Sequence, residues 1–253
     1  VAGIGDLNGD GVPDMAVGAI GDDDLAADAG VVYILFLDSD GSIKSFRKTT
    51  EQDGAFLTTA VNVVADDEFG FSLTAIGDVN GDGAVDLAVG AVRTTVNGKG
   101  YLGAVHILFM DTNGAVKSHT RFTENEGGFP SSLNTGAKLG AAVVGVGDVN
   151  GDGIPDLAVG AEADDSFGSA TGSIWILTLD VLGAIQNSVN VMDGAGGFNA
   201  TIETSDYFGR SLAAPGAFNS EDGTPDLVVG APGDDDGGNE RGAFHVLFSA
   251  PSP

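Results

Sequence analysis

The chain has 253 residues, of which 42% are hydrophobic, so it is long enough and apolar enough to bury a substantial core. Because Asp and Glu number 37 against 10 Lys and Arg, the formal charge of −27 repels nucleic-acid phosphates and anionic membranes, and neither is expected as a partner. The chain has no cysteine, which excludes disulfide scaffolds and thiolate metal sites, and no apolar run reaches the roughly 20 residues that membrane insertion requires.

The sequence repeats one motif four times at intervals of about 70 residues. The copies are DLNGDGVPDMAVGA from Asp6, DVNGDGAVDLAVGA from Asp78, DVNGDGIPDLAVGA from Asp148 and FNSEDGTPDLVVGA from Phe218. We therefore divide the chain into four units, with boundaries at 1–66, 67–136, 137–206 and 207–253. The first unit is truncated at its N-terminal edge, and the last is partial.

Each unit is predicted to contain four strands, which are clearest in the second. Its runs at 69–77, 86–91, 103–110 and 115–124 are short, rich in apolar residues, and bounded by Gly, Asp or Asn. DSDG from Asp38 and DTNG from Asp111 supply hairpin turns between the third and fourth strands. No segment has a convincing helical period, so each unit is an antiparallel four-stranded meander.

Radial stacking of such sheets gives a β-propeller, and this chain supplies a little under four blades. The small residues of the AVGA strands are expected to crowd the central axis, where their glycines allow close packing. Three arrangements are compatible with this count: a small closed four-bladed ring, an arc of a longer array completed by neighbouring repeats, or self-association of copies that complete one another's edges.

The loop D-x-N-x-D-G-x-x-D is the pattern of a calcium site. Side chains at positions 1, 3, 5 and 9 and the carbonyl at position 7 offer oxygens to a hard cation, and the glycine at position 6 permits the sharp turn. The loop is not an EF-hand, because position 12 is valine instead of a bidentate glutamate. A metal-free acidic turn is the alternative, but three copies in one register favour Ca²⁺. The predicted ligands are Asp6, Asn8, Asp10, Val12 and Asp14 in the first copy, Asp78, Asn80, Asp82, Ala84 and Asp86 in the second, and Asp148, Asn150, Asp152, Ile154 and Asp156 in the third.

The fourth copy departs from this pattern. It has Phe218 at position 1 and Ser220 at position 3, and keeps only Asp222 and Asp226. We expect this loop to be empty or to bind calcium feebly, which leaves about three sites in the chain.

These motifs resemble the FG-GAP repeats of integrin α-subunit propellers and of their microbial relatives. Phe69-Gly70, Leu139-Gly140 and Phe208-Gly209 correspond to the FG element, and Gly230-Ala231-Pro232 corresponds to the GAP element. The resemblance implies calcium in the loops between these elements. It also implies propellers that usually have seven blades and that bind partners on the face opposite the calcium hairpins.

On that face, the loop between the second and third strands is acidic in most units, but carries Arg93, Lys99 and Tyr101 in the second. A surface whose charge changes between blades could select a protein or glycan ligand. No arrangement of residues predicts a catalytic site, so we expect no enzyme activity from this chain. The sequence predicts an extracellular or cell-surface, calcium-binding module for adhesion or structural assembly. The alternative is a carbohydrate-binding or accessory propeller of a secreted hydrolase or lyase.

Overall fold

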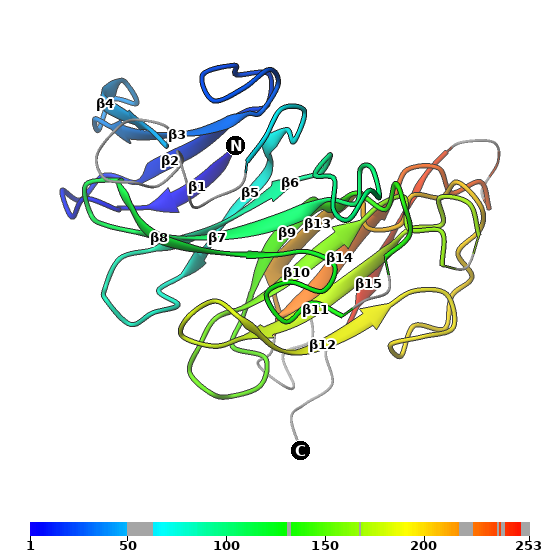
Figure 1. Cartoon of the computed structure of the whole chain (residues 1–253). Helices are drawn as coiled ribbons and strands as arrows, with labels where there is room; N and C mark the ends of the chain where they lie inside the picture. The colour runs from blue at the N-terminus through cyan, green and yellow to red at the C-terminus, as the bar shows by residue number, and fades with distance from the viewer. Residues whose placement is uncertain are drawn as a thin grey trace.

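The computed structural model describes residues 1–49, 63–130, 133–166, 168–217, 225–236, 238 and 241–248, and its regular elements are all β-strands. Three sheets have four antiparallel strands and one has three, each following chain order (Figure 1). This confirms the all-β fold and a propeller of a little under four blades. The strands are β1 (Ala2–Gly5), β2 (Asp14–Ala19), β3 (Val31–Leu37) and β4 (Ile43–Lys48); β5 (Phe69–Gly77), β6 (Asp86–Ala91), β7 (Ala104–Met110) and β8 (Val116–Phe122); β9 (Leu139–Gly147), β10 (Asp156–Ala161), β11 (Ser173–Leu179) and β12 (Ile185–Val191); and β13 (Ser211–Gly216), β14 (Asp226–Ala231) and β15 (Ala243–Leu247).

The hydrophobic core lies between blades. One buried cluster joins the first and second blades, a second joins the second and third, and a third joins the third and fourth. Trp175 on β11 belongs to the middle cluster and contacts Phe129 with ring centroids 4.8 Å apart, so it packs between the second and third blades. A single blade could not bury both faces alone, and stacking resolves this.

Glycines on the second strand of the first three blades form the seams between blades. A Cβ on Gly18, Gly90 or Gly160 would lie 1.9–2.2 Å from the carbonyl oxygen of the FG glycine in the following blade. The predicted close packing of these glycines is confirmed, but the prediction that the AVGA strands crowd the central axis is wrong. The innermost strands are β1, β5, β9 and β13, which contact one another between blades, so the AVGA strands lie second from the axis and their glycines face the next blade.

A second contact reinforces each seam. Gly30, Gly103 and Gly172, which each have positive φ, form parallel bridges to the first residue of the FG element in the next blade. Those residues, Phe69, Leu139 and Phe208, are fully buried. The FG element of one blade and the glycine of the AVGA strand in the blade before it therefore pack together as a single contact between blades.

The blades pack in chain order, from the first in blue to the last in orange and red (Figure 1). The described part of the last blade ends its sheet at β15, where Phe244 and Phe248 are largely exposed. Together with Val146, Ile176 and other apolar residues they line a groove of about 920 Å³ between the third and fourth blades.

Candidate metal-binding loops

The three D-x-N-x-D-G loops connect the first and second strands of the first three blades. The sequence turns there because glycines stand at positions 4 and 6 with φ between 75° and 90°. A Cβ at these glycines would meet nothing within 4 Å, so they are required for backbone conformation and not for space. All three loops lie at the same end of the blades as the hairpins between the third and fourth strands.

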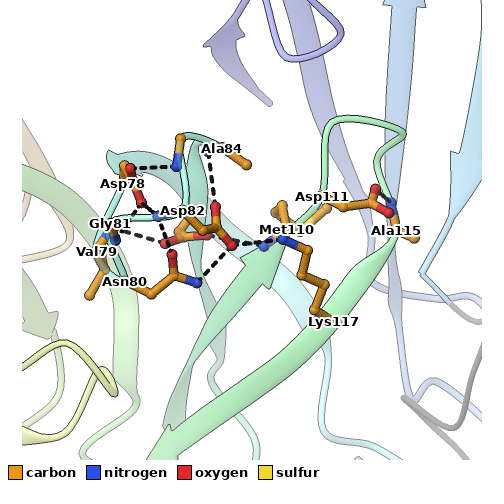
Figure 2. Close-up of polar contacts among 12 residues, drawn as sticks. Asp78, Val79, Asn80, Gly81, Asp82, Ala84, Met110, Asp111, Ala115 and Lys117 are labelled. Atoms are coloured by element: carbon orange, nitrogen blue, oxygen red, sulfur yellow. Dashed lines mark hydrogen bonds and ion pairs between the residues drawn. The ribbon is translucent and has the colours of Figure 1, made fainter.

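The side-chain oxygens of Asp78 and Asn80 point toward the backbone of the second loop (Figure 2). Oδ1 of Asp78 accepts hydrogen bonds from the amides of Gly81 and Asp82, at 2.8 and 3.0 Å. Its Oδ2 accepts from the amide of Gly83 at 2.7 Å, and Oδ1 of Asn80 accepts from the amide of Asp82 at 2.9 Å. The loops at Asp148 and Asp6 repeat this network, the latter without the position 4 bond.

The aspartate at position 9 is buried in each loop and has a structural role. Asp86 accepts hydrogen bonds from the amides of Val79 and Met110, at 2.9 and 3.0 Å, and so ties the loop to β7. Asp14 and Asp156 form the corresponding pairs of bonds in their blades. Burial, with smaller contributions from the neighbouring loop aspartates, raises the pKa of Asp86 to about 6, and burial also raises the pKa of Asp156.

The aspartate at position 5 has a partner that the sequence did not reveal. Nζ of Lys117, on β8, lies 2.7 Å from Oδ2 of Asp82 (Figure 2), and Nζ of Lys44, on β4, lies 2.7 Å from Oδ2 of Asp10. The lysine hydrogen bonds are the largest cause that lowers the pKa of these two carboxyl groups. A lysine in the outer strand therefore points at each of the first two loops.

The donor set of these loops suits a hard cation, because it consists of carboxylate, amide and carbonyl oxygens. The ammonium groups of Lys44 and Lys117 already place positive charge against the position 5 carboxylate, where a metal ion would bind. In the part of the chain that the structure describes, no three acidic or histidine side chains converge as a metal cluster. A bound ion would therefore draw on the side chains at positions 1, 3, 5 and 9 as they turn from their backbone partners.

Most of the fourth loop lies outside the described residues. Ser220 and Asp222 lie outside the described residues. Asp226 begins β14 and is buried, like the position 9 aspartates of the other blades.

At the opposite end of the blades, the basic side chains form ion pairs within the chain. Arg93 pairs with Glu68 at 3.1 Å and Lys99 with the buried Glu124 at 2.8 Å. Glu162, also buried, pairs with both Lys138 and Arg210. Lys138 directly precedes β9 in the same blade, and Arg210 directly precedes β13 in the next blade. The sequence indicated Arg93 and Lys99 as a basic surface, but could not show that acidic residues of the same blade meet them.

Two buried residues near the second blade's seam also escaped the sequence analysis. Asp67 accepts a hydrogen bond from the amide of Val64 at 2.8 Å, and burial raises its pKa. His106 on β7 is fully buried and contacts Phe69 edge to face. An aspartate recurs two residues before the FG element, at Asp67 and Asp206, and this repetition was the sequence signal that could have identified Asp67.

The sheets, the glycine seams and the acidic hairpins together define an FG-GAP repeat β-propeller. Residues 69–108 and 140–177 match the family model described as "FG-GAP repeat". These segments begin at the FG elements of the second and third blades and end in their third strands. The chain therefore contains FG-GAP repeats, as the resemblance predicted.

Curated relatives extend the similarity beyond these two segments. The chain is 31% identical over 190 residues to phosphatidylinositol-glycan-specific phospholipase D of Bos taurus. The aligned segment covers 72% of this chain and 21% of that protein. It is 29% identical over 235 residues to integrin alpha-PS2 of Drosophila melanogaster, covering 90% of this chain and 14% of the integrin. Over 174 residues it is 34% identical to integrin alpha-IIb of Mus musculus, and the alignment covers 65% of this chain and 15% of the integrin.

The chain thus spans about a fifth or less of the length of these relatives. It is similar to a segment of each one. Among the described residues there is no helix long and apolar enough to cross a membrane.

Proposed function

We propose that the chain is an extracellular, calcium-stabilised β-propeller module that binds a protein partner in cell adhesion or cell-surface assembly. The observation that carries the proposal is the threefold repetition of one oxygen-rich loop, in the same hairpin of three successive blades. An accidental acidic turn has no reason to recur in register. The similarity to integrin alpha chains supports the adhesive and extracellular parts of the proposal.

Calcium would be held by the side chains at positions 1, 3, 5 and 9 and by the carbonyl at position 7. Once bound, the ion neutralises carboxylates that otherwise repel each other and fixes the hairpin to the sheet. Because it binds the folded loop, calcium stabilises the native state by mass action. Extracellular modules bind calcium at roughly 10⁻⁴ to 10⁻³ M, a range suited to fluids outside the cell.

Bound-calcium stoichiometry and thermal unfolding test this proposal with wild type, Asp82→Ala and the control Asp193→Ala. Wild type should bind three ions and unfold at a higher temperature with calcium than with chelator. Asp82→Ala should bind two ions and lose about 2.7 kcal/mol of stability when free calcium is a hundredfold above Kd. Asp193 follows β12 at the end away from the loops, so its removal should leave both readings unchanged. No bound ion and no calcium-dependent shift in wild type would refute calcium binding.

The partner surface is assigned to the loops between the second and third strands, which differ from blade to blade. In the second blade the Tyr101 ring is half exposed and stacks against Arg93, with the guanidinium 5.4 Å from the ring centroid. Tyr101→Ala should reduce calcium-dependent attachment of chain-coated beads to cells of the source organism, while Phe46→Ala, in the outer strand β4, should not. Unchanged attachment would remove this face from consideration.

The similarity to the phospholipase D sequences favours a second candidate, an accessory propeller that accompanies a catalytic domain in a larger secreted enzyme. The coding sequence on either side of these 253 residues distinguishes the two. A catalytic domain would support the accessory role, whereas further repeats or a surface anchor would support adhesion. A glycan array with no calcium-dependent binding would count against carbohydrate recognition in either setting.

A further inference from the structure

The three loops form a natural comparison, because they have the same side-chain donors. Each has aspartate at positions 1, 5 and 9 and asparagine at position 3. The residue that faces them from the outer strand of the blade differs. It is Lys44 in the first blade, Lys117 in the second and Gln186 in the third, each the third residue after the glycine of the β-hairpin.

In the first two blades the lysine reaches the loop. Lys44 and Lys117 are each bound to the position 5 carboxylate at 2.7 Å, and both side chains are about half exposed. Oδ2 of that carboxylate faces the ammonium, while Oδ1 accepts the amide at position 7. Both oxygens that a cation would use at position 5 are therefore already engaged, and one of them, Oδ2, is engaged by a positive charge of the chain.

In the third blade no such charge is present among the described residues. The side-chain amide of Gln186 donates to Asp180, in the β11–β12 turn, at 3.0 Å. Oδ2 of Asp152, at position 5, accepts from the side-chain amide of Asn150 at 2.9 Å, a bond that the second loop also makes, in addition to its lysine. This partner is neutral and belongs to the loop itself, so it exerts no net charge repulsion on an arriving cation.

We propose that Lys44 and Lys117 act as built-in competitors of calcium, so that the third-blade loop fills at a lower calcium concentration than the first two. This inference rests on the calcium binding proposed above. To bind at position 5, the ion must displace the ammonium group from the carboxylate and then bear its repulsion at close range. Both effects weaken binding in the first two blades. Without calcium, the same lysines neutralise part of the loop charge.

The expected difference is modest, because the pairs are exposed to solvent. Surface ion pairs change equilibria by a factor of about two to five, and salt screens them. The calcium affinity of the third loop should therefore exceed that of the other two by about that factor at low ionic strength. The difference should shrink as salt is added.

Site-resolved calcium titration tests the inference through the backbone amide NMR signals of Gly11, Gly83 and Gly153, the position 6 glycines of the three loops. In wild type the Gly153 signal should reach half-saturation first. Lys44→Gln should lower the midpoint of Gly11 alone, by about two- to fivefold, and Lys117→Gln should do the same for Gly83. Gln186→Lys should raise the midpoint of Gly153 by a similar factor.

Lys48→Gln is the matched control. Lys48 lies on β4 like Lys44, but it pairs with Asp22 and Asp24 at the other end of the blade. Lys48→Gln removes the same charge as Lys44→Gln. Because Lys48 does not contact the loop, the Gly11 midpoint should stay where it is in wild type.

Equal midpoints for the three glycines, unaffected by Lys44→Gln and Lys117→Gln, would overturn the competition while leaving calcium binding intact. An equal response to Lys48→Gln and Lys44→Gln would also overturn it, because the effect would then come from net charge and not from contact. If no glycine signal moves with calcium, the proposed metal site fails and the competition falls with it.

Discussion

The two ends of the blades follow different rules. At one end, the first three blades repeat the same loop, the same buried aspartate at position 9 and the same hairpin. At the other end, each blade has its own ion pairs: Lys48 with two aspartates in the first, Lys99 with Glu124 in the second, and Glu162 with Lys138 and Arg210 in the third. The repeated end is suited to a repeated ligand such as a metal ion. The end that varies is suited to a partner that distinguishes one blade from the next.

Both ends depend on the glycine seam, so breaking it should produce the largest effect. A Cβ at Gly90 would lie 2.2 Å from the carbonyl oxygen of Gly140 and 2.5 Å from Oγ of Ser72. Gly90→Ala should therefore separate the second and third blades and lower the free energy of unfolding by about 3 kcal/mol. Denaturant unfolding measures this loss.

Gly100→Ala is the control, because Gly100 lies in the same blade with ordinary φ and nothing within 4 Å of a Cβ. Its effect should stay within about 0.5 kcal/mol. Equal losses for the two variants would mean that the seam does not carry the contact between blades.

A second variant separates the two ends by their response to calcium. Lys99→Glu places a carboxylate beside the buried Glu124 and should cost about 1–2 kcal/mol of stability. Because the pair lies away from the loops, the loss should be the same in calcium and in chelator. A loss that appears in only one of these conditions would show that the two ends are coupled.

Arg93→Gln, at the end of the blades that varies, is expected to change stability least. Arg93 and its partner Glu68 are more exposed than the Glu124 carboxylate, and Arg93 also stacks on Tyr101. Arg93→Gln should cost less than about 1 kcal/mol, because exposed pairs contribute little. Chemical denaturation of both variants, Arg93→Gln and Lys99→Glu, measures their free energies of unfolding and tests this order. A larger loss for Arg93→Gln would contradict the view that burial of the carboxylate sets the contribution of each pair.

Strand positions were predictable because local chemistry determines them. The four runs expected in the second unit correspond to β5, β6, β7 and β8 within one or two residues. Asp111 also closes the expected turn, since its side chain accepts the amides of Asn113 and Ala115. Such signals depend on residues that are neighbours in sequence.

Contacts between distant residues were not predictable in this way. The glycines of the AVGA strands were identified as sites of close packing, but only the assembled blades show that the FG element of the next blade fills the space. Likewise, nothing in the loop at Asp78 indicates that Lys117 will meet Asp82, 35 residues further back. The calcium ligands themselves stay a prediction, and the titration described above tests them.

The seams also bear on how the chain acquires its structure. In the described part of the chain, every sheet is built from one continuous stretch of sequence, and the main contacts between blades join neighbours along the chain. The contacts therefore stay within a blade or between adjacent blades, and a blade emerging during synthesis finds its predecessor already formed. The blades inside the row are supported on both sides, whereas the first and last are supported on one. Hydrogen exchange should accordingly be slowest in β6 and β10, and should quicken toward both ends of the row.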